Sequence, residues 1–165
     1  MTATNLPNPP SMVEGPRQRF LIFEAPNDAN LHLYMKEFAK HGAKTIVRAC
    51  DATYSDTKLH AAGINVVELS FPDGTSPPDT VVNEWLRILA SLEPADGEAK
   101  PTVGVHCVAG LGRAPVLVAI AMIEGGVEPL LAIKEIRAKR PGALNMPQLK
   151  YLQKYKPRGK KCVIQ

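Results

Sequence analysis

Two short segments of this chain, KTIVRAC at 44–50 and TVGVHC at 102–107, carry apolar residues at both odd and even positions, which in a strand lie on opposite faces. A strand that is apolar on both faces belongs inside a parallel sheet that is covered on both sides. Helical patterns separate the predicted strands, and this order favours a mostly parallel sheet flanked by helices, an α/β fold. In such sheets, ligands bind at the carboxyl ends of the strands. Cys107 lies at such an end, so we expect a site there.

Hydrophobic periodicity and turn residues locate the other elements. Strands are also predicted at 19–23 and 64–69. Helices are predicted at 27–42, 55–63, 79–93, 113–125, 128–140 and 146–155. Four Pro and Gly residues make 71–78 a loop, and four prolines lead us to expect a flexible segment at 1–17. The chain therefore divides into a flexible segment (1–17), one domain (18–155) and a basic tail (156–165).

The charge of the chain is concentrated at its end. The formal net charge is +4, but the last twelve residues hold five Lys or Arg and no acidic residue. The rest of the chain is close to neutral, so the composition does not predict a nucleic-acid-binding face. No signal peptide is apparent, and the three cysteines are too scattered for a disulfide scaffold, which favours a reducing compartment. The four histidines show no metal-ligand spacing, so neither a metal nor another cofactor is expected.

The sequence VHCVAGLGRAP at 105–115 predicts a strand, a glycine-bearing loop and the first turn of a helix. Such a loop directs backbone N–H groups and the positive end of the helix at one point, which forms an anion site. Arg113 adds a guanidinium that matches two phosphate oxygens. The same field stabilises an anionic Cys107 sulfur. We therefore predict attack of Cys107 on a phosphate monoester, with phosphate held by the following residues: Val108, Ala109, Gly110, Leu111, Gly112 and Arg113.

This displacement requires a proton for the leaving oxygen. Asp73, in the loop FPDG after a predicted strand, is the candidate acid, although a DG pair is also typical of a plain turn. His106 is expected either to order the loop through backbone hydrogen bonds or to fill the core. Taken alone, Cys50 reads as a core cysteine at the end of a strand.

The segment His106–Arg113 fits the His-Cys-x5-Arg signature of tyrosine and dual-specificity phosphatases. Together with TIVRACDATY, FPDGTSPP and a terminal CVIQ, it resembles the phosphatase of regenerating liver family, the prenylated type IVA tyrosine phosphatases. The resemblance implies a compact dual-specificity phosphatase fold, with Cys107 as nucleophile, Arg113 as phosphate binder and Asp73 as general acid. The acid loop departs from the family's usual form, because it lacks a tryptophan and has one residue fewer before the acid.

The same resemblance implies two further properties. Cys50 matches the position of a second cysteine that forms a disulfide with the nucleophile under oxidation. Ala114 stands where the wider superfamily carries a Ser or Thr whose hydroxyl stabilises the departing thiolate. The loss of that hydrogen bond is expected to slow turnover by roughly one to two decades.

Several functions remain open at this point. The first is a tyrosine and dual-specificity phosphatase that acts on phosphotyrosine proteins, with phosphoinositides as a second substrate class. The alternative is a docking module for the CBS-pair domains of cyclin M magnesium-transport mediators, which the resemblance implies as partners. Rhodanese-like transfer and the low-molecular-weight phosphatase class are less favoured, since in the latter the cysteine precedes the acid. Homo-oligomerisation is left open.

The terminal CVIQ is a prenylation box whose final Gln favours farnesylation of Cys162. One lipid chain anchors a protein only marginally, and the adjacent cations can each contribute about 1 kcal/mol at an anionic membrane surface. We expect the protein at the cytoplasmic face of the plasma membrane or endomembranes, and in the cytosol when it is not prenylated.

A Cys162→Ser substitution is expected to release the protein from membranes, because the basic tail alone cannot replace the prenyl chain. Fractionation of cells that express each form would measure this. Membrane association that persists in the Cys162→Ser protein would contradict the prediction.

Overall fold

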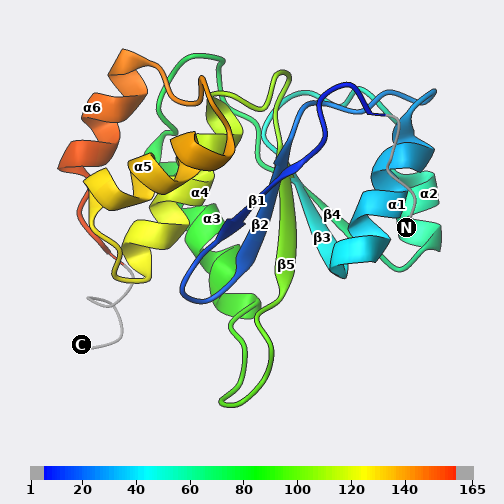
Figure 1. Cartoon of the computed structure of the whole chain (residues 1–165), viewed down its shortest axis with the longest axis horizontal. Coiled ribbons are helices and arrows are strands. Elements are labelled where there is room, and N and C mark those ends of the chain that lie inside the picture. The colour runs from blue at the N-terminus through cyan, green and yellow to red at the C-terminus, as the bar shows by residue number, and fades with distance from the viewer. Residues whose placement is uncertain (1–5, 159–165) are drawn as a thin grey trace.

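The computed structural model describes residues 6–158, and its centre is a five-stranded sheet in the order β1-β2-β5-β3-β4 (Figure 1). The strands are β1 (Ser11–Glu14), β2 (Arg19–Phe23), β3 (Ala43–Arg48), β4 (Asn65–Glu68) and β5 (Thr102–His106). The helices are α1 (Leu31–His41), α2 (Thr57–Ala61), α3 (Asp79–Ser91), α4 (Arg113–Glu124), α5 (Pro129–Lys139) and α6 (Met146–Lys154). The predicted α/β fold is confirmed.

The strand β5 lies in the middle of the sheet, and all five of its residues are buried. It pairs in parallel with β2 on one side and with β3 on the other. His106 at its end is opposite Phe23 of β2 and Arg48 of β3. The carboxyl ends of these three strands therefore lie level with one another, and the loops that follow them meet above the same edge.

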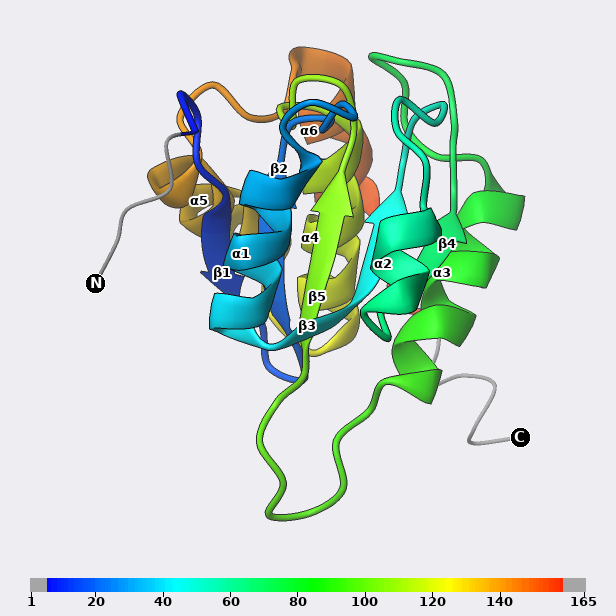
Figure 2. The same cartoon turned by 90° about the vertical axis from the view of Figure 1, so that its right-hand side faces the viewer.

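Helices cover both faces of the sheet, with α1 and α2 on one face and α3 to α6 on the other (Figure 2). Alternate residues of β2 divide between the two cores, as the two-residue period of a strand requires. Leu21 and Phe23 pack with α1 and α2, whereas Phe20 and Ile22 belong to the core beneath α3 to α6. Apolar residues on both sides of the central strands are thus explained by two separate layers of helices.

The helix α4 confirms the helix predicted at 113–125, and it is buried from Arg113 through Ile123. The indole of Trp85 on α3 packs beside it and donates a hydrogen bond to the carbonyl of Leu117 at 2.7 Å. Within residues 6–158, no helix has the length and apolar character needed to cross a membrane.

The N-terminal segment differs from the prediction. Residues 1–17 were expected to be flexible, but Ser11–Glu14 form β1, which pairs antiparallel with β2. The side chain of Val13 is fully buried in the core beneath α3 to α6. The prolines that favoured a flexible segment lie on either side of this strand and not within it, so they set its ends and leave its own N–H groups free to pair.

We expect Val13→Ala to lower the free energy of unfolding by about 2 kcal/mol, since it removes two buried methyl groups and leaves a cavity. The neighbouring Glu14 makes ion pairs with Arg19 and Lys100 that are open to solvent, so Glu14→Ala should cost less than about 1 kcal/mol. Urea unfolding of the two variants measures the difference. Equal, small losses would show that β1 is not part of the folded core.

Candidate active site

The site begins at the end of β5, where Cys107 directly follows the last residue of the strand. Residues 107–112 form the loop that leads into α4, and Arg113 is the first residue of that helix. The side chain of Cys107 is buried, with 3% of its surface exposed. We call residues 107–113 the phosphate loop.

Carbonyl groups at both ends of the phosphate loop are hydrogen bonded to the surrounding chain. The amide of Ala25, just after β2, donates to the carbonyl of Val108 at 2.9 Å. The amide of Leu144, just before α6, donates to the carbonyl of Leu111 at 2.7 Å. Both carbonyls therefore face outwards, away from the centre of the loop.

The middle of the loop is held by Arg140, a buried residue at the end of α5. Its Nε donates to the carbonyl of Gly110 at 2.9 Å, and its Nη2 donates to the carbonyl of Ala109 at 3.4 Å. Gly110 has a positive φ of 72°, and a Cβ there would lie 2.8 Å from the carbonyl of Phe23. Only glycine fits this combination of backbone angle and close approach.

These contacts determine where the amides of the loop point. In a trans peptide the C=O of one residue and the N–H of the next are opposed. Because the carbonyls of residues 107–111 are all bound outside the loop, the N–H groups of residues 108–112 face its interior. The unbonded N–H groups at the start of α4 add the positive end of the helix dipole. The result is a concave set of donors that suits an anion.

Two guanidinium groups stand close to this concavity. Burial lowers the pKa of Arg140, and the negative charges of Glu24 and of a Cys107 thiolate oppose that shift, so Arg140 lies within electrostatic reach of the sulfur. The Nη1 of Arg113 donates to the carbonyl of Phe71 at 3.2 Å. Its Nε is buried without a hydrogen-bond partner among the described residues, which leaves a donor for a ligand oxygen.

Asp73 lies on the loop between β4 and α3, with 84% of its side chain exposed. Its Oδ1 is 3.6 Å from the Nε of Arg113, so the structure brings the predicted acid next to the predicted phosphate binder. The amide of Thr75 donates to the carbonyl of Pro72 at 3.3 Å, and Gly74 has φ of 76°. These features form a tight turn that presents Asp73 at its tip. We call residues 71–75 the acid loop.

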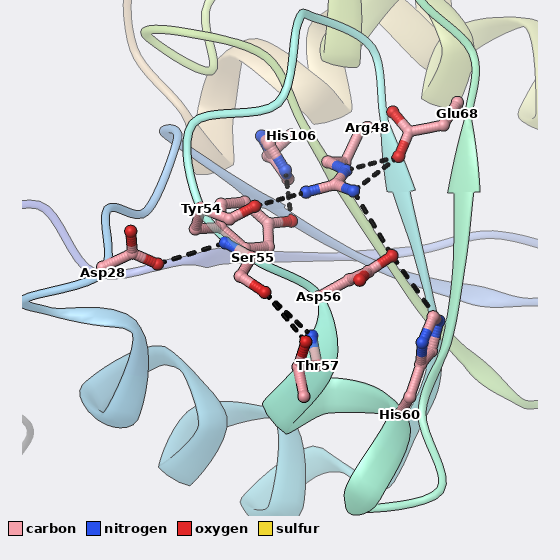
Figure 3. Close-up of polar contacts among 9 residues, drawn as sticks. All are labelled: Asp28, Arg48, Tyr54, Ser55, Asp56, Thr57, His60, Glu68 and His106. Atoms are coloured by element: carbon pink, nitrogen blue, oxygen red, sulfur yellow. Dashed lines mark hydrogen bonds and ion pairs between the residues drawn. The ribbon is translucent and has the colours of Figure 1, made fainter.

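His106 supports the start of the phosphate loop, and Figure 3 shows its contact with Tyr54. Its ring is fully buried, its Nδ1 lies 3.2 Å from the carbonyl oxygen of Cys107, and its Nε2 lies 2.8 Å from the hydroxyl of Tyr54. Burial lowers the pKa of His106 to about 4, partly opposed by the bond to the Cys107 carbonyl. The imidazole is therefore neutral near pH 7, donating to the carbonyl and accepting from Tyr54. Both expected roles, ordering of the loop and burial in the core, apply.

Tyr54 is in turn fixed by Arg48, which forms the outer part of the same network (Figure 3). The guanidinium lies 4.7 Å from the ring centre of Tyr54 and donates to its backbone carbonyl at 3.0 Å. Arg48 also pairs with Glu68 of β4 at 2.6 Å. The contacts thus run from the edge strand of the sheet to the backbone of Cys107.

Cys50 lies next to this network, two residues after the end of β3. The preceding residue, Ala49, donates its amide to the carbonyl of His106 at 2.8 Å, which continues the pairing of β3 with β5. Burial raises the pKa of the Cys50 thiol; the positive charge of Arg113 opposes this rise, and the charge of Cys107 adds to it. Cys50 and Cys107 are therefore neighbours in space, and both are free thiols.

Several residues of this site went unrecognised in the sequence, among them Arg140, Asn145 and Gln148. Arg140 reads there only as a basic residue at a helix end. Asn145 and Gln148 form a capping box at α6, a pattern that the three-residue spacing could have revealed. The predicted Cys162 lies outside the described residues. Within 6–158, no group of three His, Cys, Asp or Glu side chains is arranged to hold a metal ion.

Comparison with known proteins agrees with this geometry. The family described as "Polymorphic toxin system, DSP-PTPase phosphatase" matches residues 26–127. A "Probable protein tyrosine phosphatase type IVA A" of Dictyostelium discoideum is 56% identical over 155 residues, 94% of this chain and 92% of that protein. The human "Protein tyrosine phosphatase type IVA 3" is 47% identical over 159 residues, 96% of this chain and 90% of that protein.

A solved structure shows the same fold. The putative protein tyrosine phosphatase from Leishmania major superposes with a TM-score of 0.78 at 40% identity. The match covers 92% of this chain and 99% of that one.

The buried His106 leads to a prediction on pH. The unfolded chain takes up a proton on this residue near pH 6.5, whereas the folded protein does so only near pH 4. The unfolded state binds more protons between these values, so the free energy of unfolding should fall with decreasing pH, by about 3 kcal/mol in total. His106→Gln does not titrate and should lack this part of the dependence. Urea unfolding of both proteins at a series of pH values tests this, and parallel curves would contradict it.

Proposed function

The chain belongs to the type IVA protein tyrosine phosphatases, and on this basis we propose that it hydrolyses phosphate monoesters through a phosphocysteine on Cys107. The observation that carries the proposal is the set of outward-bound carbonyls in the phosphate loop, which leaves the opposing amides for a phosphate dianion. Phosphotyrosine proteins are the proposed substrates, and phosphoinositides remain a predicted second class.

In the first step, the amides of the loop and Arg113 hold the phosphate oxygens while the Cys107 sulfur attacks phosphorus. A sulfur–phosphorus bond forms and the bond to the leaving oxygen breaks. Asp73 gives its proton to that oxygen. The 3.6 Å separation of Asp73 and Arg113 supports this role, because it puts the carboxyl at the edge of the phosphate position.

In the second step, water attacks the phosphocysteine and Asp73, now ionised, takes the proton of the water. The sulfur–phosphorus bond breaks, the thiolate of Cys107 is restored, and inorganic phosphate leaves. Ala114 has no hydroxyl for the departing thiolate and is itself fully buried beside Arg113. We therefore propose slow hydrolysis and a long-lived intermediate.

Cys50 is proposed to protect Cys107 from over-oxidation, a role supported by the level ends of β3 and β5. A peroxide oxidises the Cys107 thiolate by two electrons to a sulfenic acid. The Cys50 thiol then attacks that sulfur, an S–S bond forms, the S–O bond breaks and water leaves. The prenylated Cys162 is proposed to hold the whole domain at an anionic membrane surface.

A second function, the docking of a protein partner, is favoured by apolar residues at the site. Val108 and Leu111 on the phosphate loop and Met146 at the start of α6 are the large hydrophobic side chains that stay exposed there, with 58%, 38% and 62% of their surfaces open. An exposed apolar rim is typical of a surface that binds protein. Docking of CBS-pair domains of the cyclin M type stays a prediction on this basis.

We expect mass spectrometry after acid quench to find one phosphate on Cys107 when the enzyme has met a phosphotyrosine peptide. The Cys107→Ser protein should carry none on a cysteine. Ala114→Ser restores a hydroxyl for the leaving thiolate, so it should speed hydrolysis about tenfold or more and reduce the trapped fraction. No phosphate on Cys107 of the wild-type protein, with peptide nevertheless hydrolysed, would refute the proposed mechanism.

A further inference from the structure

Two side-chain amides at the start of α6 hold the acid loop. The Nδ2 of Asn145 donates to the carbonyl of Gly74 at 3.1 Å. The Nε2 of Gln148 donates to the carbonyl of Thr75 at 3.2 Å. These two carbonyls directly follow Asp73 in the chain, so the contacts fix the backbone on its C-terminal side.

The side-chain oxygens of Asn145 and Gln148 accept a second pair of hydrogen bonds, which lie within the first turn of α6. The Oδ1 of Asn145 accepts from the amide of Gln148 at 2.9 Å, and the Oε1 of Gln148 accepts from the amide of Asn145 at 3.0 Å. This is the capping box that begins α6. The oxygens therefore stabilise the helix and the nitrogens hold the loop. One set of bonds can be removed without the other.

Gln148 also connects the acid loop to the phosphate loop. Its side chain is fully buried, and a Cβ on Gly112 would lie 3.2 Å from its Nε2. On the other side of Asp73, Arg113 of the phosphate loop binds the carbonyl of Phe71. Asp73 is thus held from both sides by groups that begin α4 and α6.

We propose that Asn145 and Gln148 are positioning residues, which hold the acid loop so that the carboxyl of Asp73 stays over the phosphate position. This inference rests on the proposed function of Asp73 as the general acid. Each amide nitrogen donates to a carbonyl of the acid loop. The two amides act through the carbonyls of Gly74 and Thr75, and the positive φ of Gly74 places Asp73 at the tip of the turn.

The reaction offers a specific readout of this role. A proton from Asp73 matters for a poor leaving group such as the phenolate of tyrosine, and matters little for an activated aryl phosphate whose phenol is acidic. Removal of the hydrogen bonds to the acid loop should therefore slow phosphocysteine formation from the phosphotyrosine peptide and leave the rate with the activated substrate unchanged. Damage to the phosphate loop would slow both substrates equally.

Asn145 permits variants that separate the two uses of its amide. Asn145→Asp and Asn145→Ser both retain an oxygen that can cap α6, and both residues are favoured at helix N-caps. The carboxylate of Asp has no donor, and the hydroxyl of Ser ends one bond short of the position of Nδ2, so neither reproduces the bond to the carbonyl of Gly74. Asn145→Ser carries no charge and controls for the negative charge of Asn145→Asp. Thermal unfolding should be close to that of the wild type for both.

The experiment measures the burst rate of phosphocysteine formation by rapid acid quench, with phosphotyrosine peptide and with difluoromethylumbelliferyl phosphate. Asp73→Asn is the reference for loss of the acid. Both Asn145 variants should be about two- to tenfold slower on the peptide, the change that corresponds to one neutral hydrogen bond, and unchanged on the activated substrate. In the Asp73→Asn background, Asn145→Ser should add no further loss.

The remaining outcomes separate the two proposals. If Asp73→Asn is selectively slow on the peptide and the Asn145 variants match the wild type, the positioning role is wrong and the acid role stands. If the Asn145 variants slow both substrates equally, the positioning role is also wrong. If Asp73→Asn itself shows no selective loss, Asp73 is not the acid and both proposals fail.

Discussion

The fixed direction of the peptide groups in residues 107–111 is the constraint on which the site depends. A loop of this length can turn either its carbonyls or its amides inwards, and only the second arrangement receives an anion. Here the choice is made by donors from three separate parts of the fold: the amide of Ala25, the guanidinium of Arg140 and the amide of Leu144. Each donor comes from a segment that packs against the sheet, so formation of the core also orients the peptide groups of the loop.

The neutral state of His106 limits what this residue can contribute to the site. A buried imidazole with a pKa of about 4 carries no charge near pH 7, so it cannot itself stabilise a thiolate by charge. In the proposed mechanism that task falls to the loop amides, to the start of α4 and to Arg113 and Arg140. His106 instead holds the carbonyl of Cys107, while Tyr54 and Arg48 hold His106. The network from Glu68 to Cys107 therefore fixes the position of the Cys107 backbone, whereas Arg113 and Arg140 supply the positive charge near the loop.

The sequence alone predicts those parts of the fold and of the site that a local pattern of residues determines. Strands such as β5 and the buried helix α4 follow from apolar runs, and Cys107 with Arg113 follows from a motif with fixed spacing. The sequence does not predict the role of a residue whose contacts lie far away along the chain. Arg140 reaches Ala109 and Gly110 across about thirty positions of the chain, and Asn145 reaches Gly74 across about seventy. The strand β1 was missed because its pairing with β2, rather than its own composition, orders it.

The most direct test of the account is a nitrogen–proton NMR titration of the protein with inorganic phosphate, followed at each backbone amide. We predict that the amide signals of residues 108–113 shift together and saturate with a single dissociation constant, because those N–H groups bind the phosphate oxygens. Arg113→Met should weaken the binding, while the same group of signals still responds. Shifts confined to other parts of the chain, with residues 108–113 unaffected, would contradict the central claim that these amides converge on an anion.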